Sequence, residues 1–235
     1  MSEDAQLPIE SVSQEPPVDV VPQNEESVSP DTSHHNAPRY TFARAIVFFA
    51  SFCLMTIELV AGRVMAPYLG VSLYTWTSVI VIVLLGVTLG NYAGGRLADM
   101  RLSRMLLGGY FLLAGLATLL MIVLAPVIGP RLAGSDIALP LSTALFCFLA
   151  FFPVGFFLSM ISPQVVKGDL HTLETTGATI GTIGAWSAIG SILGTFATGF
   201  VFVMYVGTRQ LLWTLSAALI LVGLATMWRI GKKSA

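Results

Sequence analysis

The sequence has little charge and almost no cysteine. Only 11% of its 235 residues are Asp, Glu, Lys or Arg, while 55% are hydrophobic and the mean hydropathy is +0.80. A soluble globular protein carries about 25% charged residues, so this composition indicates a membrane protein. The two cysteines, Cys53 and Cys147, lie inside apolar runs. They cannot form a disulfide framework and are expected to be small packing residues.

Recognisable catalytic and cofactor motifs are missing as well. The chain has no G-x-G-x-x-G after a strand, no Walker loop, no H-E-x-x-H and no G-x-S-x-G. We therefore assign no catalytic residue, expect no cofactor, no metal site and no nucleic-acid partner, and leave open whether the protein takes part in an enzymatic reaction.

Positive charge is absent before Pro38, a stretch that holds eight of the 13 acidic residues. This stretch is rich in Pro, Glu, Ser, Gln and Val without helical or strand periodicity, so it cannot bury enough apolar surface to fold. It also lacks the basic start and apolar core of a signal peptide. We expect a disordered acidic cytoplasmic tail at 1–40, a transmembrane domain at 41–231 and a short basic end at 232–235.

Long apolar runs make up most of the remaining chain. Six of them approach the roughly 20 residues that a helix needs to cross a bilayer. They predict an all-α membrane protein with transmembrane helices at residues 43–65, 74–97, 104–127, 138–162, 177–205 and 209–229. Breaks between these helices are read at Pro67 and Gly70, at 98–103, 129–136 and 163–176, and at Gly207 and Thr208. Pro153 predicts a kink inside the fourth helix.

The basic residues are divided unequally between the two sides of these helices. Arg63, Arg131 and Arg209 would lie on one side. The other side collects nine, namely Arg39, Arg44, Arg96, Arg101, Arg104, Lys167, Arg229, Lys232 and Lys233. Because basic loops remain in the cytoplasm, we expect both termini there. The expected location is the inner (plasma) membrane of a bacterium, with the lipid bilayer as the main partner.

One acid, Glu58, interrupts the apolar run of the first helix. An ionised side chain at mid-membrane costs about 2.5–3.5 kcal/mol on insertion scales, so Glu58 is expected to face protein or water. Two interpretations stay open: a protonatable or cation-binding group, and a structural acid that ties helices together. Arg63 lies about 140° around the helix from Glu58, so the two cannot pair along one face.

Polar residues at matching depth are the candidate partners of Glu58. We expect its carboxyl group to face the bundle near Ser187 and Ser191. The other candidates are Thr118 and Ser216, together with Asn91, which lies nearer the inner face.

A charged loop follows the second helix and contains Gly95, Arg96, Asp99, Arg101 and Arg104. Such a loop can make a tight cytoplasmic turn that holds two helices in a gated contact. The alternative is an ordinary loop that obeys the positive-inside rule. The stretch resembles the loop motif of major facilitator transporters, G-x-L-A-D followed by a basic cluster. It departs from that motif at Leu102, where the second glycine would stand.

Small residues are concentrated in the fifth helix. Gly177 and Gly181, and likewise Gly190 and Gly194, are four residues apart, which leaves one helix face bare enough for another helix to approach closely. Close packing is the favoured interpretation. A pathway lined by Ser and Thr hydroxyl groups is the alternative.

Five runs of the chain resemble one known family in the same order. They are ELVAGRVMAPYLGVSLYTWTS (58–78), GNYAGGRLAD (90–99), ISP (161–163), SAIGSILGTFATGF (187–200) and GTR (207–209). Together these runs resemble the membrane part of the fused major-facilitator/spermidine-synthase proteins, over about residues 43–230. The resemblance implies a bundle like one half of a major facilitator.

The same resemblance implies a function. Family members carry a C-terminal spermidine-synthase-like domain of the S-adenosylmethionine-binding type, whereas this chain stops at Ala235. We therefore expect a non-catalytic membrane subunit that works with a separately encoded synthase-like partner in polyamine-related chemistry. The alternative is a small-solute or cation transporter that acts as a homodimer, with Glu58 as its intramembrane acid. A purely structural membrane anchor is a third possibility.

Overall fold

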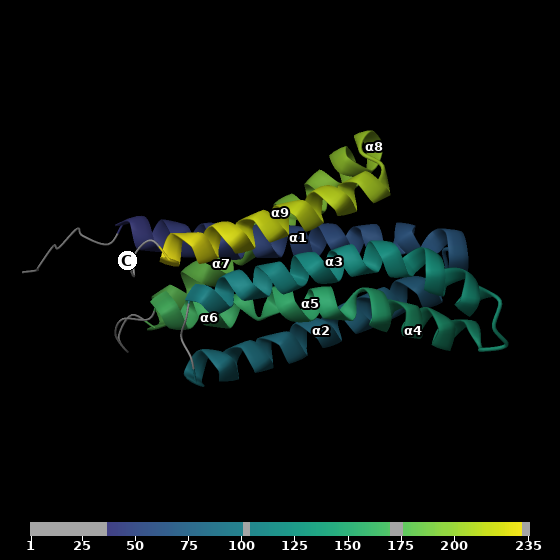
Figure 1. The fold of residues 1–235 in the computed structure, drawn as a ribbon, viewed down its shortest axis with the longest axis horizontal. Helices are drawn as coiled ribbons and strands as arrows, with labels where there is room; N and C mark the ends of the chain where they lie inside the picture. Colours follow the sequence, from purple (N-terminus) through teal and green to yellow (C-terminus); the bar gives the residue numbers. More distant parts are fainter. Residues whose placement is uncertain (1–36, 101–103, 170–175, 232–235) are drawn as a thin grey trace, which may run out of the picture. The chain divides into compact units, whose positions relative to one another are not determined.

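The computed structural model describes residues 37–100, 104–169 and 176–231, and their regular structure is entirely helical (Figure 1). The predicted basic end at 232–235 and most of the predicted tail fall outside these residues; Ala37–Tyr40, expected to be disordered, are helical. The elements in chain order are α1 (Ala37–Leu69), α2 (Leu73–Met100), α3 (Arg104–Ala133), α4 (Leu139–Ala150), α5 (Phe152–Ser159), α6 (Ile161–Asp169), α7 (Thr176–Phe196), the π-helical turn η1 (Ala197–Phe202), α8 (Val203–Tyr205) and α9 (Thr208–Gly231).

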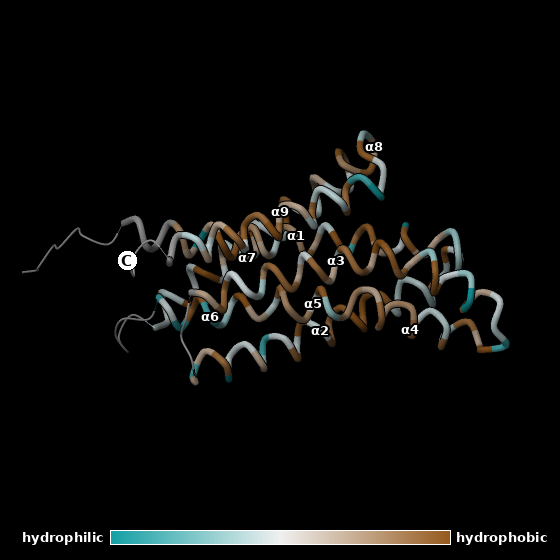
Figure 2. The backbone as a smooth tube through the Cα atoms, in the orientation of Figure 1, coloured by the Kyte–Doolittle hydropathy of each residue, from teal (hydrophilic) through white to brown (hydrophobic). Residues whose placement is uncertain are grey.

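The long helices have the dimensions of membrane spans. Five segments are long and apolar enough to cross a bilayer, and the pair α4 with α5–α6, bent by 44°, makes a sixth if it counts as one span. Figure 2 shows hydrophobic residues along most of the length of these helices. The prediction of an all-α protein whose helices are long and apolar enough to span a membrane is confirmed for the described residues. The five segments are Phe42–Leu69, Leu73–Met100, Met105–Ala133, Thr176–Tyr205 and Thr208–Trp228.

Two helices end one to two turns later than predicted, although both breaks follow within the predicted stretches. Helix α1 continues through Pro67 to Leu69, and α3 continues through Pro130 to Ala133. A proline removes one backbone hydrogen bond, whereas ending a helix early in a bilayer would leave several backbone groups without partners. The chain turns at Gly70, as predicted, and its φ of 73° is a left-handed conformation that glycine adopts without strain.

Glycines bring helices α2 and α5–α6 into direct backbone contact. Gly86, Gly90 and Gly94 recur every four residues along α2, on the face that packs on α5 and α6. A methyl group added to Gly94 would lie 2.7 Å from the Cα atom and 2.8 Å from the carbonyl oxygen of Met160. Such close approach favours van der Waals contact and weak Cα–H···O bonds, which are the main attractions between helices in lipid.

The other two helix pairs are built in the same way. On α7, Gly194 lies against α1, where an added methyl group would be 2.6 Å from the Phe52 carbonyl oxygen. Between α3 and α9, Gly108 and Gly223 face each other, and a methyl group on either would lie within 2.9 Å of the other's carbonyl oxygen. The predicted close packing of Gly190 and Gly194 is thereby confirmed.

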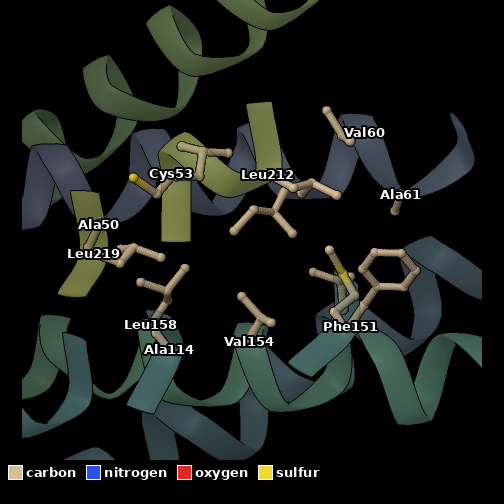
Figure 3. Close-up of a cluster of buried hydrophobic side chains, with 14 of the residues drawn as sticks. Ala50, Cys53, Val60, Ala61, Ala114, Phe151, Val154, Leu158, Leu212 and Leu219 are labelled. Carbon is tan, nitrogen blue, oxygen red and sulfur yellow. The ribbon is translucent and has the colours of Figure 1, made fainter. Parts of the chain in front are cut away.

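Helix α1 contacts α2, α3, α5, α7 and α9, so the apolar core gathers around it. Figure 3 shows Ala50, Cys53 and Val60 of α1 in one buried cluster with Ala114 of α3, Leu158 of α5 and Leu212 of α9. Cys53 and Cys147 are both fully buried and free, as expected for packing residues.

The predicted kink in the fourth span is also present. Helix α4 ends at Ala150, and Pro153 lies in the first turn of α5, where its missing N–H group has no helical partner to lose. A second break at Met160, before Pro163 in α6, was not predicted. The two breaks divide this span into three short helices.

Candidate functional site

Glu58 lies on the side of α1 where α2 and α7 flank it. Its side chain is half-buried and lines a cavity of about 180 Å³, here named the Glu58 cavity. The other lining residues are Met55 and Leu59 on α1, Trp76, Val79 and Ile80 on α2, and Thr195 on α7. The cavity is open to the outside of the bundle, since Trp76 and Ile80 are 41% and 46% exposed.

A second cavity of about 270 Å³ lies next to the first and is here named the Arg63 cavity. Leu59 and Trp76 line both cavities, so the two are contiguous around α1. The remaining lining residues are Gly62, Arg63, Ala66, Val71, Thr75, Thr198, Gly199 and Val203. An acid and a base therefore line neighbouring parts of one hollow whose walls are otherwise largely apolar.

The turn before α2 positions Trp76. Ser72 caps this helix: its hydroxyl oxygen accepts a hydrogen bond from the Thr75 backbone N–H (3.3 Å), and its carbonyl oxygen accepts one from the Trp76 N–H (3.2 Å). The Thr75 hydroxyl donates to the Gly70 carbonyl oxygen at 3.2 Å. The indole ring then lies over Gly62 of α1, where an added methyl group would be 3.2 Å from the ring.

The wall contributed by α7 is locally irregular. The π-helical turn η1 follows Thr195 and contains Thr198 and Gly199, which line the Arg63 cavity. Thr198 is fully buried and donates a hydrogen bond of 2.6 Å to the Gly194 carbonyl oxygen. Single π-helical turns inside membrane or soluble helices occur frequently at functional sites.

The two charged groups of this hollow have no hydrogen-bond or ion-pair partners among the described residues. Within residues 37–100, 104–169 and 176–231, neither the Glu58 carboxylate nor the Arg63 guanidinium takes part in a hydrogen bond or an ion pair. A carboxylate in such a setting is expensive in free energy. An occupant that carries positive charge would reduce this cost at Glu58.

The predicted partners of Glu58 lie elsewhere. The Ser187 hydroxyl lies 2.7 Å from that of Ser51, about two helical turns before Glu58 on α1. Ser191 is half-buried and, like Ser187, does not line the Glu58 cavity. Ser191 lies about one turn and Ser187 about two turns of α7 before Thr195, which is the residue at the level of Glu58 because the close contacts at Gly190 and Gly194 set the crossing of α1 and α7.

The two remaining hydroxyl candidates are occupied within the bundle. Thr118 is buried in α3 and donates to the Ala114 carbonyl oxygen of its own helix at 2.8 Å. Ser216 of α9 donates to the Gly115 carbonyl oxygen at 2.9 Å and joins α9 to α3. Neither lines the Glu58 cavity.

The predicted loop motif lies at the opposite end of α2. Asn91, Gly95 and Asp99 line a third cavity of about 430 Å³ together with Ser162 and Lys167 of α6. Asp99 forms an ion pair with Lys167, which joins the end of α2 to α6. Arg96 places its guanidinium 4.9 Å from the centre of the Tyr92 ring, Arg101 lies outside the described residues, and Arg104 is the first residue of α3.

Gly177 and Gly181, the other predicted glycine pair of α7, do not pack closely against another helix of the described residues. No atom of the described residues would come within 4 Å of a methyl group added to Gly177, Gly181 or Gly184. Close packing therefore holds for Gly190 and Gly194 only.

Several important residues were not found from the sequence. Trp76, Thr195 and Arg63 share the hollow with Glu58. Of these three, Trp76 alone had a signal in the sequence, because aromatic residues are enriched at the membrane interface. The four-residue spacing of Gly86, Gly90 and Gly94 was visible and has the same form as that seen in the fifth span.

Comparison of the chain with known protein families, curated proteins and solved structures finds no match. Within the part of the chain that the structure describes, no group of three His, Cys, Asp or Glu side chains is placed to hold a metal ion.

Proposed function

We propose that this protein binds a small organic cation at Glu58 inside the membrane and transports it. One observation carries the proposal: Glu58 is half-buried among apolar helices, has no partner in the described residues and lines a cavity. A bound cation compensates the carboxylate, whereas a purely structural acid would be expected to hold a hydrogen-bond partner from another helix.

The residues around Glu58 favour an organic cation over a metal ion. Ca²⁺ takes six to eight oxygen ligands and Mg²⁺ demands an octahedral set, but only Glu58 and Thr195 bring side-chain oxygen atoms to this cavity. An ammonium group needs fewer oxygen atoms. It is also attracted to the face of an indole ring, and Trp76 supplies such a ring beside Glu58.

The architecture we propose for transport has six spans, with α4 and α5–α6 forming one bent span. The pairs α1 with α7, α2 with α5 and α3 with α9 support a bundle like one half of a major facilitator. A single six-helix bundle would supply only half of a transport pathway, so we propose a homodimer. The unequal distribution of basic residues supports cytoplasmic termini and a bacterial inner membrane.

A liposome assay tests the transport proposal. Uptake of labelled n-butylamine should exceed that of protein-free liposomes, and Glu58→Gln should abolish the excess because the amide keeps hydrogen bonding but not charge. Asp136→Asn removes an exposed acid outside these cavities and should leave uptake unchanged. Uptake that survives Glu58→Gln would refute the proposal, as would the absence of uptake of both labelled n-butylamine and labelled 4-aminobutyrate by the unchanged protein.

A second candidate is the membrane subunit that the family resemblance implies, with a soluble spermidine-synthase-like partner. Tyr92 and Met100 are 60% and 72% exposed on either side of the exposed Arg96, which favours a docking surface at this end of α2. Charged residues at the edge of a protein–protein interface mainly increase the association rate, and salt screens their effect. Co-purification with such a partner should weaken as salt rises and weaken further after Arg96→Gln, and a complex indifferent to both would contradict this candidate.

A further inference from the structure

We infer that the ligand is a zwitterion, which places its ammonium group at Glu58 and its anionic group at Arg63. The inference rests on the proposed function, since it requires that Glu58 binds a cation. It adds an anionic group to the ligand and thereby excludes simple amines and polyamines as the preferred class.

The Glu58 cavity and the Arg63 cavity form one continuous hollow. Leu59 and Trp76 line both of them, so one molecule can extend from one into the other. Glu58 and Arg63 are five residues apart on α1, which corresponds to a rise of roughly 7.5 Å along the helix axis and a rotation of about 140°. A ligand that reaches both groups must therefore carry its opposite charges at the two ends of a flexible chain that follows the surface of α1 past Leu59 and Trp76.

The positive charge of Arg63 favours a ligand that carries an anionic group. Arg63 is exposed and, within the described residues, unpaired, and its guanidinium carries a positive charge. It repels a second ammonium group in the neighbouring cavity. It attracts a carboxylate or a phosphate, which a guanidinium can bind through two parallel hydrogen bonds.

The wall between Glu58 and Arg63 is apolar and suits a carbon chain. Trp76 and Leu59 present apolar surface where the cavities meet. Gly62 allows the indole ring to lie close to α1, because any side chain there would press on the ring at 3.2 Å. The carbon chain of a zwitterion would pack along this wall while its two ends reach Glu58 and Arg63.

Two sources can supply this chemistry in a membrane. One is a free amino-acid-like molecule, and the other is the phosphoethanolamine headgroup of a phospholipid, which enters from the lipid because the hollow is open to the outside of the bundle. Both carry an ammonium group with N–H donors and an anionic group. The experiment therefore needs an arm for each source.

The first arm measures binding by calorimetry to the purified full chain in lipid-free detergent. The probes are 4-aminobutyrate, n-butylamine and butyrate, which share a carbon chain and differ in their charged ends. We expect 4-aminobutyrate to bind at least about tenfold more tightly than either of the others, since each charge-assisted contact is worth that much or more. Arg63→Gln should lower its affinity to that of n-butylamine, and Glu58→Gln to that of butyrate.

Two further variants separate a binding effect from misfolding. Arg131→Gln removes another exposed arginine, in the last turn of α3, and should change nothing. Arg63→Lys keeps the charge and should restore part of the affinity, which a folding defect would not.

The second arm uses nanodiscs of phosphatidylethanolamine or phosphatidylcholine and counts the lipids retained by native mass spectrometry. The choline headgroup has the same charges but no N–H donor for Glu58. Preferential retention of phosphatidylethanolamine, lost in both Glu58→Gln and Arg63→Gln, supports the inference with lipid as the source. Tight binding of 4-aminobutyrate without such retention supports it with a free molecule as the source.

The outcomes distinguish this inference from the proposed function. Equal binding of n-butylamine and 4-aminobutyrate, unaffected by Arg63→Gln but lost in Glu58→Gln, overturns the zwitterion and leaves the cation site. If no probe responds to Glu58→Gln and neither lipid is retained, both are wrong.

Discussion

Replacing Gly94 by alanine should separate α2 from the break between α5 and α6. The added methyl group would lie 2.7 Å from the Met160 Cα atom and 2.8 Å from its carbonyl oxygen. Both are backbone atoms, so no side-chain rotation relieves the overlap and the helices must move apart by more than half an ångström. Gly95→Ala is a matched control one residue away, where nothing lies within 4 Å of the new methyl group.

The two variants should change the free energy of unfolding in opposite directions. Overpacking costs about 1–3 kcal/mol, and the rigid neighbours at Gly94 place this variant at about 3. Alanine is about 1 kcal/mol better than glycine inside a helix, so we expect Gly94→Ala to lose about 2 kcal/mol and Gly95→Ala to gain about 1. For a protein of this size, the gap of about 3 kcal/mol corresponds to a difference in melting temperature of about 6–12 °C.

The protein carries its own reporter for this measurement. Cys53 and Cys147 are fully buried and free, so a thiol-reactive dye should label them only as the bundle unfolds. Melting curves recorded with this dye in detergent give the order Gly95→Ala, unchanged protein, Gly94→Ala from highest to lowest. Equal melting temperatures for the two variants would refute the close contact between α2 and Met160.

Three further outcomes are expected. Cysteines introduced at Asp136 and Met100, both exposed, should be labelled by an impermeant reagent from opposite sides of the membrane, with Asp136→Cys reacting from outside; the reverse pattern in intact cells would contradict the proposed orientation. The Asp99–Lys167 ion pair is largely exposed, so a double-mutant cycle should give a coupling of about 1 kcal/mol or less, and a much larger value would contradict the solvent exposure of the pair. Ser51→Ala should destabilise the bundle by about 1 kcal/mol through loss of its bond to the α7 serine, whereas an unchanged melting temperature would show that this bond contributes nothing.

Some properties of this protein follow from local sequence alone. An apolar run of about 20 residues in lipid must satisfy its backbone hydrogen bonds internally, so it forms a helix whatever its neighbours are. The same logic identifies Glu58 as unusual without any structure, because an acid within such a run is visible in the sequence. The kink at Pro153 is local too, since it follows from the missing N–H group.

The composition of the hollow was decided by tertiary structure. Counting residues along straight helices placed Ser187 and Ser191 beside Glu58, but the backbone contacts at Gly190 and Gly194 set the crossing of α1 and α7 and brought Thr195 there instead. Residue spacing along one helix reports depth and face. Which side chains of different helices meet depends on crossing angles, and these arise from contacts between residues far apart in the chain.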